Sequence, residues 1–165
     1  CYIQISGGKT TVNASGDGLD SNGSITVTGG TTFVSGSTSS ADAALDYDGT
    51  GTITGGIILL CGSNGMAQNF GTASTQGSIL VNYTGSSTAP VTLADNDGNT
   101  IVTYTPPKTY HSVVVSAPSL AKGNTYSLTA CGQTQSITLS SLIYGSGGMG
   151  GGGAPQPGGR PGGRP

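Results

Sequence analysis

Oxygen-bearing side chains recur at matching places in two neighbouring stretches of the sequence. Asp20 and Asp46 each follow a leucine, and Asn22 and Asp48 come two residues after them. Strands in successive layers lie about 4.8 Å apart, so two stacked carboxylates would repel each other unless a cation or a proton lay between them. Carboxylate and amide oxygens are the ligands that calcium prefers. The spacing therefore predicts a calcium site, with Asp17 as a fifth donor.

A second interpretation of these aspartates stays open. Asp and Asn are common in turns because their side chains accept hydrogen bonds from their own backbone, and Asp17 fits that role as well as it fits a metal site. Asp95 and Asp97, in the stretch DNDGN, are predicted to be turn residues. The later glutamate of an EF-hand loop is missing there.

A phrase made of a β-branched residue, a polar residue and two glycines occurs three times in the first half of the chain. The glycine pairs begin at Gly7, Gly29 and Gly55, so the spacings are 22 and 26 residues. Such a period is typical of chains that stack one structural unit on the next. The surrounding threonines, valines and isoleucines favour strands over helices. Residues 1–77 are therefore predicted to form about three coils of a parallel β-helix.

The period ends after residue 77. Six short stretches that alternate polar and apolar residues follow at a spacing of roughly ten, separated by turn signals. They predict a small antiparallel sheet or sandwich over residues 78–144, which would cap the last coil. Residues 145–165 are rich in Gly and Pro and have too few apolar side chains to offset the entropy cost of ordering. We expect them to form a tail.

The charge balance argues against some classes of partner. The chain has 5 Lys and Arg against 7 Asp, and because two arginines lie in the tail, three lysines face seven aspartates in the rest. A nucleic-acid binder would need a basic stripe. The longest apolar run, residues 57–61, is too short to span a membrane. The chain opens within a predicted strand, so we expect a mature or excised piece of a secreted protein; a lipidated Cys1 is the alternative.

Three cysteines leave at least one thiol unpaired. Cys61 ends an apolar run in the third repeat and Cys131 ends a predicted strand in the second half, so a disulfide between them is one possibility. Buried free thiols are the alternative, and the sequence does not decide between the two.

The residue types give little support for catalysis. A polysaccharide lyase on a β-helix would combine calcium with a Lys or Arg base, yet residues 1–77 contain only Lys9 and no arginine. A hydrolase would need one protonated carboxyl group of a pair, whereas calcium would keep Asp46 and Asp48 ionised. His111 is the sole histidine and has no nucleophile motif around it. We predict a protein without catalytic activity.

Several motifs occur in an order that resembles one family of secreted bacterial proteins. They are SGDGLDSNGSITVTGG, ALDYDGTGTITGG, GSNGMAQ and YTPPKTYHSVVVSAPSLAKGNTYSL. From residue 7 to about residue 153, the sequence resembles the C-terminal portion of the clostridial-type carbohydrate-binding-domain family. The resemblance implies a right-handed parallel β-helix similar to that of pectate lyases. It also implies calcium on the coils and binding of cellulose or acidic plant polysaccharides without established catalysis.

These observations together predict a secreted or cell-surface, calcium-stabilised module that binds a polysaccharide. Sugar rings stack on aromatic side chains, and in a chain without Trp this role falls to tyrosine. Tyr47, between Asp46 and Asp48, is the candidate, with core packing as the alternative for its ring. A second hypothesis is structural: an open stack presents an unpaired edge, so copies could join end to end into an extracellular fibre or surface assembly.

Overall fold

The computed structural model describes residues 1–145, which form twelve strands in three sheets and no helix. The strands are β1 (Tyr2–Asn13), β2 (Leu19–Ser21), β3 (Ser24–Ser35), β4 (Leu45–Tyr47), β5 (Gly51–Gly62), β6 (Ser78–Ser87), β7 (Val91–Asp95), β8 (Thr100–Tyr104), β9 (Tyr110–Ser116), β10 (Thr125–Ala130), β11 (Gln133–Thr138) and β12 (Ile143–Tyr144). The predicted all-β class is confirmed. No helix in this range is long and apolar enough to cross a membrane. The predicted tail lies, apart from its first residue, outside the described residues.

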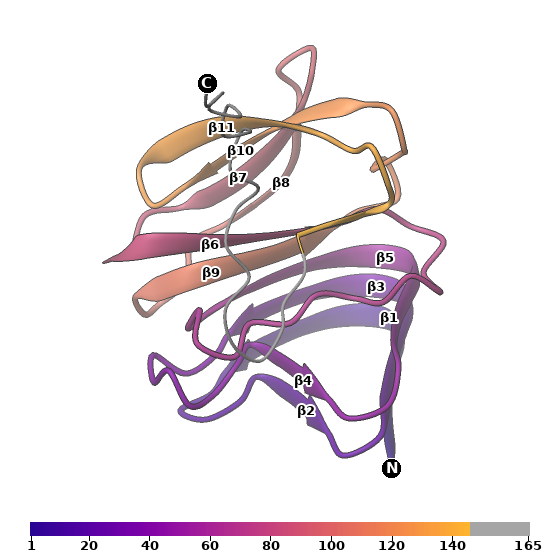
Figure 1. Cartoon of the computed structure of the whole chain (residues 1–165), viewed down its shortest axis with the longest axis vertical. Helices are drawn as coiled ribbons and strands as arrows, with labels where there is room; N and C mark the ends of the chain where they lie inside the picture. The colour runs from indigo at the N-terminus through magenta and orange to yellow at the C-terminus, as the bar shows by residue number, and fades with distance from the viewer. Residues whose placement is uncertain (146–165) are drawn as a thin grey trace, which may run out of the picture.

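The largest sheet has six strands in the order β1-β3-β5-β9-β6-β12. β1, β3 and β5 run parallel and curve together on one side of the molecule (Figure 1). Ile5, Val27 and Ile53 are register partners, and each of these strands has an irregularity where its glycine pair follows. The repeated phrase therefore sets the register of the three parallel strands.

The glycine pairs allow neighbouring backbones to approach each other closely. A Cβ on Gly55 would lie 2.4 Å from the carbonyl oxygen of Thr28 on the adjacent strand, which is closer than real Cβ atoms come. The second glycine of that pair, Gly56, has a φ of +85°, a conformation that side chains rarely adopt. Both positions consequently need glycine, for different reasons.

Both faces of the six-stranded sheet are buried at its middle strands, β5 and β9. On one face, alternate residues of β5 and β9, such as Leu59 and Val113, pack with the four-stranded sheet in one apolar cluster. On the other face, Ile58 and Val114 join the second cluster, which also contains residues of β2, β3 and β4. Side chains of a strand alternate between faces, so strands with apolar residues at every position lie between two layers.

The second sheet is antiparallel, with the order β11-β10-β7-β8. Its two hairpins have turns that suit their sequences. Cys131 and Gly132 have φ values of +50° and +69° between β10 and β11, as in a type I′ turn. Between β7 and β8, Asp95 Oδ1 accepts hydrogen bonds from the backbone N–H groups of Asp97 at 3.0 Å and Asn99 at 2.8 Å. The predicted turn role of the DNDGN stretch is confirmed.

The predicted right-handed parallel β-helix of about three coils is wrong. Parallel pairing links β1, β3 and β5, the small sheet of β2 and β4, and β12 with β6, but residues 1–145 contain no solenoid and no closed sheet. The physical reason lies at β5, whose edge pairs with the antiparallel strand β9 instead of a further parallel coil, and whose Leu59 and Cys61 pack in one apolar cluster with the four-stranded sheet. The strands expected to form a separate cap over 78–144 accordingly divide: β6, β9 and β12 extend the first sheet, and the others form the second.

Replacing Gly55 with alanine tests the close backbone contact. Because the added Cβ would meet the carbonyl of Thr28, Gly55→Ala should lower the free energy of unfolding by about 1–3 kcal/mol, the usual cost of overpacking. Gly85→Ala is the matched control, since a Cβ there meets nothing within 4 Å. Urea unfolding measures both variants, and equal stabilities would mean that the strands can move apart freely.

Candidate functional site

Two places combine polar side chains that could bind a ligand, and the first is the edge formed by β2 and β4. These strands run parallel, and Asp20 and Asp46 are register partners. Leu19 and Leu45, which are also register partners, are both buried, while Asp20 is exposed and Asp46 is half-buried. The ladder continues past the strands, because the N–H of Asp48 donates to Ser21 O at 3.1 Å. The predicted stacking of the two aspartates is confirmed.

The carboxylates at this edge influence one another electrostatically. Partial burial is the largest cause that raises the pKa of Asp46, and repulsion from the carboxylates of Asp17, Asp20 and Asp48 adds to it. The backbone N–H of Tyr47 lies close enough to lower the pKa and so opposes the shift. Ionisation of Asp46 is therefore less favourable in the folded protein than in the unfolded chain.

The residues predicted to hold calcium do not form a ready set of ligands. Among residues 1–145 there is no group of three or more carboxylate, imidazole or thiol side chains arranged to hold a metal ion. Asp17 Oδ1 accepts a hydrogen bond from Ala43 N at 2.6 Å, and this contact holds the loop before β4. Asn22 and Asp48 are exposed after their strands. Of the predicted ligands, Asp20 and Asp46 are thus the two that the fold places in register. Calcium binding stays a prediction.

Tyr47 is held by the segment that follows β5. Its N–H donates to Gln68 Oε1 at 3.0 Å, and its hydroxyl donates to the carbonyl of Asn69 at 2.6 Å. Its ring lies against Gly51, where a Cβ would be 2.2 Å from a ring carbon. Burial raises the pKa of the hydroxyl. These contacts give Tyr47 a packing role; its predicted role in binding sugar remains untested.

The cysteines do not form the disulfide considered between Cys61 and Cys131. All three thiols are free. Cys61 is fully buried in the six-stranded sheet, and burial raises its pKa. Cys131 lies in the turn between β10 and β11, where its Sγ contacts the carbonyl oxygens of Gly85 at 3.8 Å and Tyr110 at 3.9 Å. Burial raises the pKa of this thiol as well.

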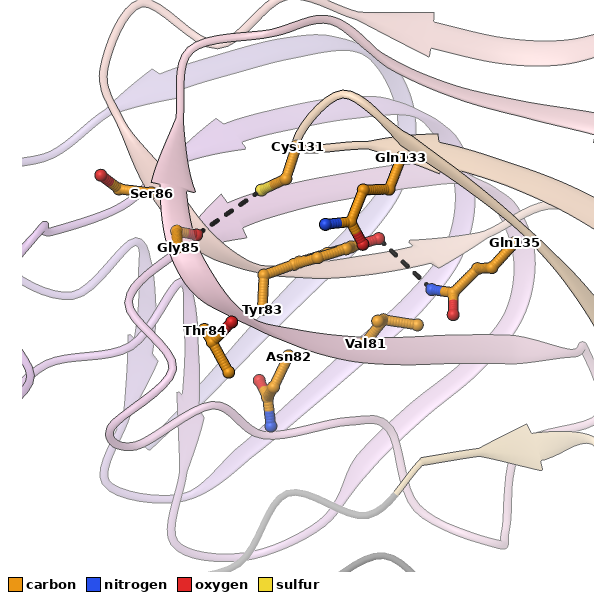
Figure 2. A pocket seen from close by; sticks show the side chains of 9 residues that line it. All are labelled: Val81, Asn82, Tyr83, Thr84, Gly85, Ser86, Cys131, Gln133 and Gln135. Carbon is orange, nitrogen blue, oxygen red and sulfur yellow. Dashed lines mark hydrogen bonds between the residues drawn. The ribbon is translucent and has the colours of Figure 1, made fainter.

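The second place is a hollow between β6 and the β10–β11 hairpin, with a volume of about 250 Å³. Figure 2 shows Tyr83, Gln133 and Gln135 on the same side of β6, whereas Asn82 and Thr84 point to the other side. Gln135 Nε2 donates to the hydroxyl of Tyr83 at 3.4 Å. We call this hollow the glutamine pocket; its lining residues are Val81, Asn82, Tyr83, Thr84, Gly85, Ser86, Cys131, Gln133 and Gln135.

The glutamine pocket is polar, and none of the side chains that line it in the described part of the chain is ionised at neutral pH. Its floor is Tyr83, which is 9% exposed and whose pKa is raised to about 12, mainly by burial. The carbonyl of Tyr83 accepts a hydrogen bond from Asn64 Nδ2 at 2.9 Å, which ties β6 to the loop after β5. Side-chain amides offer donors and acceptors in one plane, so the pocket suits a neutral ligand rich in hydroxyl groups.

A larger hollow of about 560 Å³ lies beside the β7–β8 turn. Its lining includes Asp95, Asp97 and Asn124. Asp95 already accepts hydrogen bonds from the turn, and those bonds hold its pKa below the usual range. This carboxylate therefore serves the turn, and the hollow offers fewer free groups than its size suggests.

Sequence reasoning missed the two glutamines of the pocket. Gln133 and Gln135 are two residues apart on an edge strand, so they share one face of it. That spacing was visible in the sequence. What was not visible is that the facing residue is Tyr83 of β6, because β6 and β11 belong to different sheets.

No protein-family model, no curated protein and no solved structure matches this chain. The resemblance to the carbohydrate-binding-domain family is therefore still a hypothesis, which rests on the quoted motifs.

Replacing Asp46 with asparagine tests the repulsion at the acidic edge. The raised pKa means that the stability contributed by protonated Asp46 is present below the unfolded pKa of about 3.9 and is lost as the pH rises through the folded pKa. In chelator, Asp46→Asn should thus match the parent near pH 3.5. At pH 7 it should be more stable by about 0.5 kcal/mol or less, since solvent screens the charges.

Urea unfolding at the two pH values measures this difference, with Asp97→Asn as a control in a remote turn. A gain for Asp46→Asn that is the same at both pH values would show that charge is not the cause.

Proposed function

We propose that this chain is a non-catalytic polysaccharide-binding module that works outside the cell or on its surface. The observation that carries the proposal is the glutamine pocket, which sets two side-chain amides beside a tyrosine in an open hollow. Sugar hydroxyl groups both donate and accept hydrogen bonds, and amides match both roles. The extracellular location belongs to the same proposal and is supported by the composition and the resemblance described above.

The charges favour a neutral polysaccharide such as cellulose over an acidic one. Among residues 1–145, no lysine or arginine lines the glutamine pocket. Residues 1–145 carry seven aspartates against three lysines, so a polyuronate would meet net repulsion on approach. An acidic glycan would need a bridging cation, and it would have to bind at the edge of Asp20 and Asp46 rather than in the pocket.

The chemistry of the pocket supports binding without catalysis. Glycoside hydrolysis uses two carboxyl groups that flank the scissile bond, and none lines the pocket. Among the side chains that line the pocket, the strongest potential nucleophile is the Cys131 thiol. Because its pKa is raised, the thiol stays protonated at neutral pH and is a poor nucleophile.

Truncating the glutamines tests the pocket. Gln133→Ala and Gln135→Ala should each weaken binding to a soluble neutral glucan about 2–10-fold, the effect of losing one hydrogen bond of about 0.5–1.5 kcal/mol. The measurement is retardation in native gels that contain a cellulose derivative or polygalacturonate. Asn13→Ala is the matched control, because Asn13 is an exposed amide on β1, in a different part of the molecule.

Retardation of the parent by the neutral glucan, lost in the glutamine variants and kept in the control, would support the proposal. If polygalacturonate alone retards the chain, or if the glutamine variants bind as the parent does, the pocket is not the glycan site.

Calcium is the second part of the proposal, and Asp20 and Asp46 would hold it. The support is the unfavourable ionisation of Asp46 beside three other carboxylates, which a divalent cation would relieve. With two carboxylates in register and no third arranged to join them, the affinity should resemble that of weak extracellular sites, about 10⁻⁴–10⁻³ M. Calcium would then stabilise the edge rather than take part in a reaction.

Thermal unfolding in calcium and in chelator tests this part. Calcium at ten times its dissociation constant should stabilise the folded parent by about 1.4 kcal/mol. Asp46→Asn should lose that gain, while Asp97→Asn should keep it. Equal melting temperatures of the parent in calcium and in chelator would remove calcium from the proposal and leave the glutamine pocket untouched.

The structural alternative, an end-to-end fibre or surface assembly, has less support. Joining copies head to tail would pair the two edges of the six-stranded sheet, β1 and β12. These edges are unequal, since β1 has 12 residues and β12 has 2. A continuous sheet between copies would leave most of β1 unpaired, so we favour the binding module.

A further inference from the structure

Among residues 1–145, the outermost strand of the six-stranded sheet, β1, has a neighbour on one side only. β3 pairs with it, and the other side of its backbone is open (Figure 1). All 12 of its residues are exposed or half-exposed. Its one charged side chain is Lys9, and it contains no proline. Natural sheets usually shield a long edge with several charges, a proline or a covering loop, and the sequence of β1 provides neither of the first two.

The glycines of β1 mark the space on its open side. At the matching positions of β3 and β5, a Cβ on Gly29 would lie 2.6 Å from Ser6 O, and a Cβ on Gly55 would lie 2.4 Å from Thr28 O. In both cases the contact is a carbonyl of the preceding strand. A Cβ on Gly7 would meet nothing within 4 Å. β1 thus has the gap that accommodates a strand backbone in the other two layers, and nothing in residues 1–145 fills it.

The second glycine supports the same conclusion. Gly8 has a φ of +75°, close to the +87° of Gly30 and the +85° of Gly56. Residues 7 and 8 therefore hold the conformation that the paired strands hold, although no strand of residues 1–145 lies on their open side. The open edge is already shaped for pairing.

Apolar side chains that are register partners on β1, β3 and β5 form rows across the sheet, and these rows end at β1. Ile25 and Val27 are fully buried, whereas their partners Ile3 and Ile5 are half-exposed. Val12 is half-exposed in the same way beside buried Val34. A strand placed on β1 with apolar residues at the corresponding positions would extend each row by one strand.

We propose that β1 accepts a further polypeptide strand that runs parallel to it and carries the same phrase, a β-branched residue, a polar residue and two glycines. The argument is continuity: the pairings of β1 with β3 and of β3 with β5 already show this geometry twice. The added strand would place its carbonyls over Gly7, as Ser6 and Thr28 do over the next glycines. Main-chain hydrogen bonds would supply affinity, and the glycine pair would supply specificity.

The test uses a labelled peptide with the sequence of residues 24–35, SITVTGGTTFVS. Fluorescence anisotropy should show saturable binding to the parent chain. Gly7→Ala should weaken binding about tenfold or more, because the new methyl group fills the space that the peptide carbonyl needs. Gly85→Ala, another strand glycine with open space around it, should bind the peptide as the parent does.

Stability measurements separate binding from folding. Gly7→Ala should unfold at the same urea concentration as the parent, since its Cβ meets nothing in the free protein, whereas Gly29→Ala should unfold earlier. Hydrogen exchange gives a second readout that needs no substitution: the peptide should slow exchange in β1 and leave β11, the edge of the other sheet, unchanged.

Four results would overturn the proposal. They are failure of the parent to bind the peptide, undiminished binding by Gly7→Ala, equal binding of a peptide of the same composition without adjacent glycines, GSTFGVTSITVT, and self-association of the chain that Gly7→Ala abolishes while the peptide does not compete. The third would mean that β1 does not recognise the phrase with the glycine pair, and the fourth would identify the occupant as a second copy of this chain.

Discussion

The close contact between backbones at the glycine pairs is the constraint on which the first half of the molecule depends. Where Gly55 lies against the carbonyl of Thr28, no side chain can intervene, so β3 and β5 are held at one register. That register extends beyond the strands concerned. The short strands β2 and β4, which precede β3 and β5 in the chain, lie side by side in the same way, and Asp20 is the partner of Asp46. The acidic edge is thus a consequence of a backbone contact at the other end of each repeat.

The arrangement of the second half follows from β5. Its last residues are apolar on both faces, and a strand of that kind is stable only between two layers. β9 brings Val113 and Val115 to one face and Val114 to the other, and then pairs with β6. β6 in turn carries Tyr83 to the hairpin of β10 and β11. The position of the glutamine pocket therefore depends on the pairing of β5 with β9 and of β9 with β6.

The sequence predicted local features well and the partners of strands poorly. The repeated phrase predicted the register of β1, β3 and β5 because it recurs in each of the three strands. The DNDGN stretch predicted the turn around Asp95 because that turn depends on neighbouring residues. The β-helix was wrong because pairing of β5 with β9 joins segments about fifty residues apart, and no local pattern records it. The glutamines were missed for the same reason. The spacing of Gln133 and Gln135 can be read from the sequence, but their position opposite Tyr83 cannot.

The acidic edge shows which interaction decides when two conflict. Repulsion among exposed carboxylates is worth about 0.2–1 kcal/mol, since solvent screens it. Burial of a leucine side chain contributes about 1.5–3 kcal/mol, and the register that pairs Asp20 with Asp46 also buries both Leu19 and Leu45. Moving β2 by one residue would separate the charges but would turn the leucine outward. Leucine burial therefore reinforces the register that the glycine contacts set, the carboxylates follow, and the raised pKa of Asp46 is the electrostatic consequence.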